Sequence, residues 1–394
     1  MPGRTRFIPL RYPLRSLRVR WSPSLFSAIG IGFTIAVFAA VLALRDGFGT
    51  VMGATGADDV LVYLRQGSRA EGDSVVRHPA ESAVLRSRPE IALAADGTPM
   101  AAVEASLGAR LPRLDGTGLG VVTVRGVEPA SFAIQGPRLR IVDGRLPAFG
   151  TDEVVAGRSL SRRIRGCVVG GTIEINLTTF RVVGLFEHEG AYASEIWGDV
   201  ERITAATDRP ARQRVIARRG AHVDVAALRT TLEADRRTPM TVQTEREHFA
   251  AQASRLSRTL GFLALVLAVL MGGAATIGAI NTMVAAVGAR TREVGVLAAL
   301  GFSRRAIFLS FLVEGAALGL VGGLVGCLVV LPLHGMETAT MNWNTFAEVG
   351  FAFRVTPALV ADAFALAVTL GLCGGAAPAW RASRILPTAA LRRL

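Results

Sequence analysis

Residues 260–287 read LGFLALVLAVLMGGAATIGAINTMVAAV and contain no charged side chain. About 20 such residues in a helix are enough to cross the hydrocarbon core of a bilayer. Three further runs reach that length: residues 25–44 carry no charge, 307–333 carry only Glu314, and 358–377 carry only Asp362. The fold class that we predict is an α-helical membrane protein with four transmembrane helices, one before and three after a long insert.

Positive charge gathers beside these runs. The formal net charge is +13, and three arginine-rich segments, 1–21, 288–306 and 378–394, contain only one acid, Glu293. The positive-inside rule assigns such segments to the cytoplasm. We therefore expect a bacterial inner-membrane protein with both termini inside and the insert outside. The charge then reports topology, which argues against a nucleic-acid partner.

These limits divide the chain into ten segments. A cleaved signal peptide is the alternative interpretation of the first run, and Pro378 is expected to end the last helix. The predicted segments are a basic leader 1–21, transmembrane helix 22–45, extracytoplasmic domain 46–244, stalk helix 245–259, transmembrane helix 260–287, cytoplasmic coupling segment 288–306, transmembrane helix 307–333, extracytoplasmic loop 334–356, transmembrane helix 357–377 and cytoplasmic tail 378–394.

The second span has an unusual beginning. Thr244 and Glu247 have the spacing of a capping box, and no Gly or Pro follows between Arg246 and Leu260. We predict one helix over 245–288, on the order of 65 Å long at about 1.5 Å per residue. About five turns of it would project outside as a stalk. A shorter helix broken near Ser257 is the alternative.

The insert has the pattern of a mixed α+β domain with two lobes. Short apolar runs between Gly, Pro and Asp predict strands, and residues 215–242 resemble a β-α-β unit around a helix at 224–234. Polar, glycine-bearing segments at 67–73 and 115–120 are expected to be loop tips or boundaries between the lobes. The predicted strands are 60–64, 121–127, 153–156, 172–175 and 180–186.

Catalytic chemistry is not indicated. The five His are scattered, and Glu187-His188-Glu189 is better explained as a solvated turn than as a metal site. The chain has no lysine, and a P-loop needs one to contact phosphate. We therefore expect no catalytic residue, metal or cofactor on this chain, and any ATP hydrolysis would have to occur on another chain.

Residues 291–305 form a short amphipathic segment between two spans. Val294, Leu297 and Leu300 are three apart, and charge gathers at both ends of the segment. A helix of this kind, lying on the inner membrane surface, is suited to receive a push from a soluble partner.

Small and polar residues mark the spans. Glycines four apart allow helix backbones to approach closely, either within one chain or between two. Asn281 and Glu314 are the polar residues at depth. Glu314 is expected either to pair with Arg304 or Arg305 or to serve a substrate. The packing glycines are Gly315, Gly319, Gly322, Gly323 and Gly326. The loop 334–356 is expected to lie in the outer membrane interface or to line a substrate entry.

Several motifs together resemble a known family. Residues 290–301 read RTREVGVLAALG, 311–315 read FLVEG, and 378–392 read PAWRASRILPTAALR. In the insert, DGR at 143–145, DEVV at 152–155 and VVGLF at 182–186 add to the likeness. The chain resembles the FtsX-like permeases of MacB-type ABC transporters, with a MacB-like periplasmic core domain in the insert.

This resemblance implies a permease that forms a dimer with a second copy or a paralogue and binds two ABC ATPase subunits. A membrane-fusion adaptor and membrane lipids are further partners that it suggests. Residues 291–301 would be the coupling helix. Its ATPase-coupling residues would be Arg292, Glu293, Val294, Leu297, Leu300 and Gly301.

The implied activity is mechanotransmission. ATP hydrolysis on the partner would move the insert through the stalk and thereby export or extract a lipid, lipoprotein, peptide or drug-like molecule. The alternative is a signalling subunit like FtsX itself, which activates a periplasmic cell-wall hydrolase.

Overall fold

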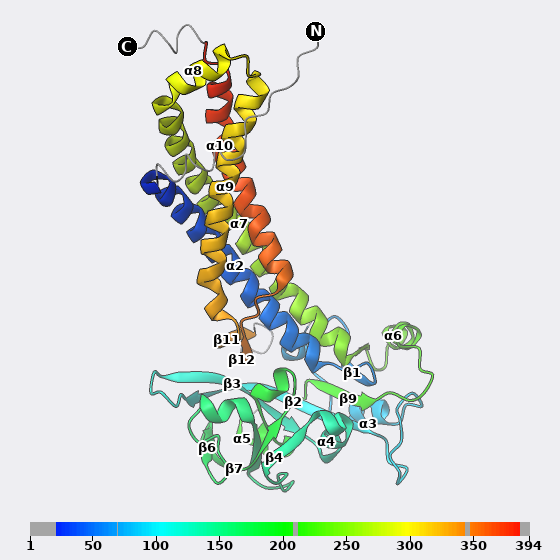
Figure 1. Cartoon of the computed structure of the whole chain (residues 1–394). Coiled ribbons are helices and arrows are strands. Elements are labelled where there is room, and N and C mark those ends of the chain that lie inside the picture. Colours follow the sequence, from blue (N-terminus) through cyan, green and yellow to red (C-terminus); the bar gives the residue numbers. More distant parts are fainter. Residues whose placement is uncertain (1–20, 69, 208–211, 343–346, 387–394) are drawn as a thin grey trace. The chain divides into compact units, whose positions relative to one another are not determined.

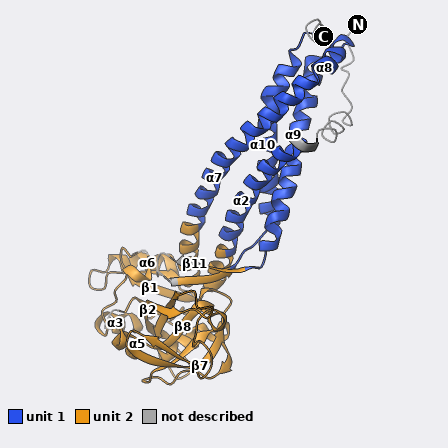
Figure 2. Cartoon of the chain, turned by 90° about the vertical axis from the view of Figure 1, so that its left-hand side faces the viewer, with its two compact units in different colours: residues 1–47, 257–336, 352–394 blue, residues 48–256, 337–351 orange. Residues whose placement is uncertain are grey.

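The computed structural model describes residues 21–386 except 69, 208–211 and 343–346. The predicted leader up to residue 20 and the end of the tail therefore lie outside the described residues. The chain forms two compact units (Figure 2). The helical unit comprises the described residues up to 47, 257–336 and those from 352 onward. The sheet domain comprises 48–256 and 337–351.

Within the described residues, four helices are long and apolar enough to cross a membrane. They are α2 (Trp21–Thr55), α7 (Glu245–Ala289), α9 (Arg304–Val330) and α10 (Pro357–Ser383). A short helix, α8 (Thr291–Ala299), joins α7 to α9 (Figure 1).

Two of these helices are longer than the sequence predicts. Helix α2 continues ten residues past the predicted end at 45, and this extension buries the side chains of Phe48 and Met52. Helix α10 runs through Pro378 to Ser383, so the prediction that Pro378 ends it is wrong. Neighbouring helices make a proline inside a membrane helix tolerable, because they compensate for its missing hydrogen bond.

The five glycines of α9 all pack against helices of the same chain. Gly315, Gly319 and Gly323 face α10, where a Cβ added to Gly315 would lie 2.6 Å from the carbonyl oxygen of Gly371. Gly322 and Gly326 face α2, and a Cβ on Gly326 would lie 2.7 Å from the Gly32 oxygen. The sequence allows these glycines to pack either within one chain or between two chains, and the structure shows packing within the chain.

Helix α7 is a single helix of 45 residues, without a break near Ser257. The capping box at its start is confirmed. The Glu247 N–H donates to Thr244 Oγ1 at 3.1 Å, and the Thr244 N–H donates to Glu247 Oε2 at 3.2 Å. These two bonds satisfy backbone donors that the first helical turn leaves without partners.

The sheet domain contains a ten-stranded mixed sheet in the order β10-β1-β9-β2-β3-β8-β5-β7-β4, with β6 paired to β7. The strands are β1 (Val60–Arg65), β2 (Ala101–Pro112), β3 (Leu119–Val127), β4 (Arg140–Gly144), β5 (Glu153–Gly157), β6 (Thr172–Ile175), β7 (Thr178–Glu187), β8 (Glu195–Asp199), β9 (Arg214–Arg218) and β10 (Met240–Thr244). Its helices are α3 (Ala80–Arg86), α4 (Pro129–Gln135), α5 (Val200–Ala206) and α6 (Val225–Ala234).

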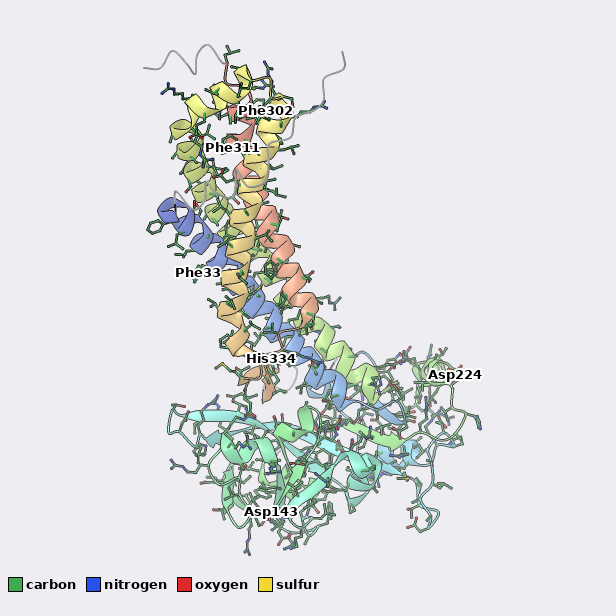
Figure 3. All side chains as sticks on the ribbon, viewed as in Figure 1. Phe33, Asp143, Asp224, Phe302, Phe311 and His334 are labelled. Carbon is green, nitrogen blue, oxygen red and sulfur yellow. The ribbon has the colours of Figure 1, made fainter. Side chains whose placement is uncertain are left out.

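The five predicted strands are present, but the predicted β-α-β unit is split. Strand β1 pairs antiparallel with both β9 and β10 and lies between them. The helix predicted at 224–234 is α6, and Asp224 caps it by accepting from the Ala226 N–H at 2.9 Å (labelled in Figure 3). One apolar core lies around β1 and β9 and another around β5 and β7. The two predicted lobes are thus two cores along one continuous sheet.

The segment 334–356 contains a β-hairpin that the sequence does not predict. It forms a hairpin of β11 (Glu337–Asn342) and β12 (Ala347–Ala352), and residues 337–351 belong to the sheet domain. Glu348 pairs with Arg113, and the ring of Phe351 meets that of Phe48 edge-on at 5.7 Å. The described strands of this loop therefore pack on the sheet domain, while the apolar residues at 343–346 lie outside the described residues.

Candidate functional site

The turn from α7 into α8 consists of one residue, Arg290. Its carbonyl accepts the Val294 N–H at 2.9 Å and so begins α8. Its side chain turns inward and pairs with Glu314 of α9, Nη1 to Oε2, at 3.3 Å. Both side chains are buried. Of the two roles expected for Glu314, the structure shows pairing with a nearby arginine, but the residue is Arg290 and not Arg304 or Arg305.

The other end of α8 is closed by a Schellman motif. The Phe302 N–H donates to the Leu297 carbonyl and the Gly301 N–H to the Ala298 carbonyl, both at 3.1 Å. Gly301 has φ +86°, a left-handed conformation that glycine adopts without strain. Ser303 then caps α9 through the Ala306 N–H at 3.2 Å. Figure 3 shows Phe302 at this turn. Helix α8 is therefore held at both ends.

The apolar residues of α8 do not share one face. Val294 is 1% exposed and packs with Met283, Ile307 and Phe311 in the core of the helical unit. Leu297 is half-buried, whereas Leu300 is 60% exposed. Val294 therefore packs inside the helical unit and is not available to a partner, so its prediction as an ATPase-coupling residue is wrong. The exposed surface of α8 consists of Arg292, Glu293, Val296, Ala299 and Leu300.

The outer surface of α7 is sparsely covered. Only 17% of its most apolar window is buried, against 50% for α2. Asn281 lies on this exposed surface. A cavity of about 430 Å³ between α2 and α7 is lined by residues that include Phe26, Phe33 and Met271. Figure 3 labels Phe33 on α2.

The sheet domain holds a buried ionic cluster that the sequence does not predict. Arg125 of β3 donates to Glu195 at 2.7 and 2.8 Å and to Glu71 at 2.9 Å. Arg214 of β9 donates to Glu104 at 2.6 and 2.8 Å and to Glu71 at 2.6 Å. All five side chains are at most 9% exposed. Glu71 lies in the segment 67–73 that we expected to be a polar loop tip.

These contacts decide the charge state of Glu71. Burial alone would raise the pKa of Glu71, but the guanidinium groups of Arg125 and Arg214 hold it well below its ordinary value. The carboxylate therefore stays ionised. Both arginines contribute to this, and removing one partner of a buried ion pair leaves an uncompensated charge.

The Glu187-His188-Glu189 segment is not a solvated turn. His188 is buried, and its Nδ1 accepts the Gly190 N–H at 3.0 Å. Burial, with a smaller contribution from Arg138, lowers the pKa of His188 to about 4. In the part of the chain that the structure describes, no three His, Cys, Asp or Glu side chains are grouped to hold a metal ion.

The first residue of α7, Glu245, is a further buried carboxylate. Glu245 accepts hydrogen bonds from Tyr192 at 2.7 Å, Gln135 at 2.9 Å and the Ala57 N–H at 3.2 Å. It thereby connects the start of α7 to α4, to the segment before β8 and to the residues that follow α2.

Membrane-length helices, a short capped helix between two of them and a large mixed sheet domain define a membrane protein of the permease class. Residues 24–235 match the family MacB-like periplasmic core domain, and residues 262–387 match FtsX-like permease C-terminal. The chain belongs to this family of MacB-like permeases.

Relatives with assigned names agree with this. The chain is 27% identical over 428 residues to a macrolide export ATP-binding/permease protein MacB of Brucella melitensis, covering 97% of this chain and 60% of that protein. It is 34% identical over 240 residues to a pyoverdine export ATP-binding/permease protein PvdT of Pseudomonas savastanoi, covering 57% and 34%. The chain thus spans less than two thirds of the length of these relatives.

Among solved structures, the periplasmic region of MacB from Actinobacillus actinomycetemcomitans aligns with 52% of this chain and 94% of its own. The TM-score is 0.37 and the sequence identity 14%.

Proposed function

We propose that this chain is the permease subunit of an ABC exporter. ATP binds and is hydrolysed, with Mg²⁺, on ABC ATPase subunits that dock on α8. The observation that carries the proposal is α8 itself. Its ends are held by the Arg290–Glu314 pair and the Gly301 cap, so force applied to its exposed surface passes to α7 and α9 without bending the helix first.

The exposed residues of α8 suit a protein partner. Arg292 and Glu293 offer charge of both signs, and Val296 and Leu300 offer apolar area that water covers in the free chain. An apolar centre with a polar rim is typical of protein interfaces. The 394 residues contain no lysine, so the phosphate-binding lysine of a P-loop has to come from outside them.

The proposed topology is one transmembrane helix before and three after the sheet domain, in a bacterial inner membrane. Arg292 within α8 and the arginines beside it at 290, 304 and 305 support a cytoplasmic position for it. Both termini would then lie in the cytoplasm and the sheet domain outside.

A second permease copy is proposed to pack on the exposed surface of α7. An amide that faces lipid, as Asn281 would in a monomer, gains a hydrogen-bond partner when another helix covers it. Only 17% of the apolar window of α7 is buried within one chain, which leaves room for such a helix.

Transport is favoured over the signalling role. The relatives carry the word export in their names, and the cavity between α2 and α7 is lined mainly by apolar side chains. We propose an apolar or amphipathic cargo, such as a lipid, lipoprotein, peptide or drug-like molecule, moved by mechanotransmission. A membrane-fusion adaptor is a further proposed partner.

The test is co-purification from native membranes with a tag on this chain. An ABC ATPase should accompany the wild type and be lost from Leu300→Asp, while membrane insertion is unchanged. Leu177→Asp is the matched control, because Leu177 is 92% exposed in the turn between β6 and β7. Equal recovery of the ATPase with Leu300→Asp, or ATP hydrolysis by the purified chain alone, contradicts the proposal.

A further inference from the structure

The chain passes between its two units four times, within α2, within α7, before β11 and at the end of β12. On the sheet-domain side, these passages meet at one short segment, Gly190–Ser194, which we call the joint. Most of the joint is a turn of 3₁₀ helix, Ala191–Ser194, and β8 follows it directly.

Helix α2 contacts the joint at its first residues. The Ala191 N–H donates to Oγ1 of Thr55, the last residue of α2, at 2.7 Å. A Cβ added to Gly190 would overlap the Thr55 backbone. The chain can therefore approach α2 this closely only because residue 190 is glycine.

Helix α7 contacts the joint at Tyr192. Its hydroxyl donates to Glu245 Oε1 at 2.7 Å and accepts from Arg214 Nη2 at 2.9 Å. The ring meets that of Phe249, one turn into α7, edge-on at 5.5 Å. One side chain thus connects the first residues of α7 to the buried ionic cluster.

The β11–β12 hairpin contacts the joint at Ser194. The Gly350 N–H of β12 donates to Ser194 Oγ at 3.2 Å, and Arg163 donates to the same oxygen at 3.3 Å. Strand β11 is paired with β12 and so shares this attachment.

We propose that the joint is a positioning element of the exporter, at which displacements of α2, α7 and the hairpin are combined and passed into β8. Strand β8 lies between β3 and β5 in the sheet, and Glu195, its first residue, holds Arg125 of the ionic cluster. A displacement of the joint therefore reaches the core around β5 and β7 through β8, whose Ile196 belongs to that core. It reaches β9 through the hydrogen bond between Tyr192 and Arg214. This inference rests on the proposed function, because it identifies where the ATP-driven motion enters the sheet domain.

The chain alone allows a first test, by hydrogen–deuterium exchange of the full-length protein in lipid nanodiscs. Ser194→Ala removes the hairpin attachment, Thr55→Val the α2 attachment and Tyr192→Phe the α7 attachment. If the joint combines the three attachments, each variant should also speed amide exchange at the two attachments that it leaves intact. The loss of one hydrogen bond to a buried group predicts an increase in the exchange rate of about tenfold. The diagnostic amides are Gly350 for Thr55→Val and Ala57 for Ser194→Ala.

Two buried hydroxyls elsewhere in the sheet domain supply matched controls. Ser131 Oγ and Tyr63 OH have no hydrogen-bond partner among the described residues, so Ser131→Ala and Tyr63→Phe should leave exchange at the joint unchanged. Faster exchange at only the amide whose partner was removed would overturn the proposal, because the three attachments would then be independent. Each variant decides this alone, so one that fails to reach the membrane does not end the test.

The complex gives a readout that a purely structural role would not change. With the co-purifying ATPase, ATP should alter exchange in residues 245–256 and in β8 of the wild type. Tyr192→Phe should keep the first change and lose the second, and retention of both changes contradicts the proposal. If no ATPase co-purifies, the proposed function fails, while the exchange test on the chain alone still decides whether the joint combines the three attachments.

Discussion

The Arg290–Glu314 pair allows the sharpest test of how α8 is held. Replacing Arg290 by Ala leaves the Glu314 carboxylate buried without the guanidinium that lies 3.3 Å away. At that distance, two unit charges attract by about 5 kcal/mol if the effective dielectric constant is about 20. Removal of one partner from a buried pair usually costs about 3–5 kcal/mol. We expect a loss in this range at the junction of α7, α8 and α9.

The assay is hydrogen–deuterium exchange of the amides of 290–303 in the full chain in nanodiscs. A loss of about 3–5 kcal/mol should speed their exchange by roughly 100- to 5,000-fold. Arg292→Ala is the control, because Arg292 is exposed on α8 and its loss should leave exchange nearly unchanged. The double variant Arg290→Met with Glu314→Leu should recover much of the protection, because an apolar pair needs no charge compensation. Exchange within threefold of the wild type in Arg290→Ala would refute the argument.

Three further predictions concern packing and pH. Val294→Ala should lower the stability of the helical unit by about 1.5–3 kcal/mol, whereas Val296→Ala should change it by less than about 0.5 kcal/mol. Thermal unfolding in detergent measures both changes. The opposite ranking would reverse our assignment of the buried and exposed faces of α8. Gly319→Ala should destabilise the same unit by about 1–3 kcal/mol because its Cβ would overlap the α10 backbone, while Gly278→Ala, with open space around it, should be neutral or stabilising in the same assay. The pKa of His188 is lowered to about 4 in the folded chain. As pH falls, His188 therefore binds a proton in the unfolded chain before it does so in the folded chain. The free energy of unfolding is at its full value above about pH 6.5 and falls by about 3 kcal/mol between about pH 6.5 and 4. Urea unfolding at several pH values should show this loss in the wild type and not in His188→Asn, and identical pH profiles would contradict the assignment.

The features that could be predicted from the sequence are those decided within a few residues. Uncharged runs predict the long helices because only a buried or lipid-facing helix can be apolar all round. The cap at Thr244 is equally local, since donor and acceptor are three residues apart. The short helix at 291–299 can be predicted for the same reason, since Gly301 just after it is a local signal for the end of a helix.

The features that could not be predicted depend on partners far away in the chain. Strand β2 was missed because Glu104 interrupts its apolar pattern, and that carboxylate is buried only because Arg214 reaches it from β9. Glu71 stands in a sequence typical of a surface loop, yet two arginines more than 50 residues away draw it inside. Likewise, which side of α8 is buried depends on α9, so the spacing of Val294 and Leu300 could not decide it.

Each end of helix α7 is held by a contact that involves a buried carboxylate. Glu245 at its first residue is held by Tyr192 and two further donors, and Arg290, one residue past its end, is held by Glu314. Between them, 45 residues form one helix without a proline or a break. An uninterrupted helix changes its length little under load because every backbone hydrogen bond would have to stretch together. Under the proposed function, a displacement at α8 would therefore be better conserved along α7 than along a jointed connection, and Glu245 and Arg290 mark the two contacts at which we expect coupling to weaken.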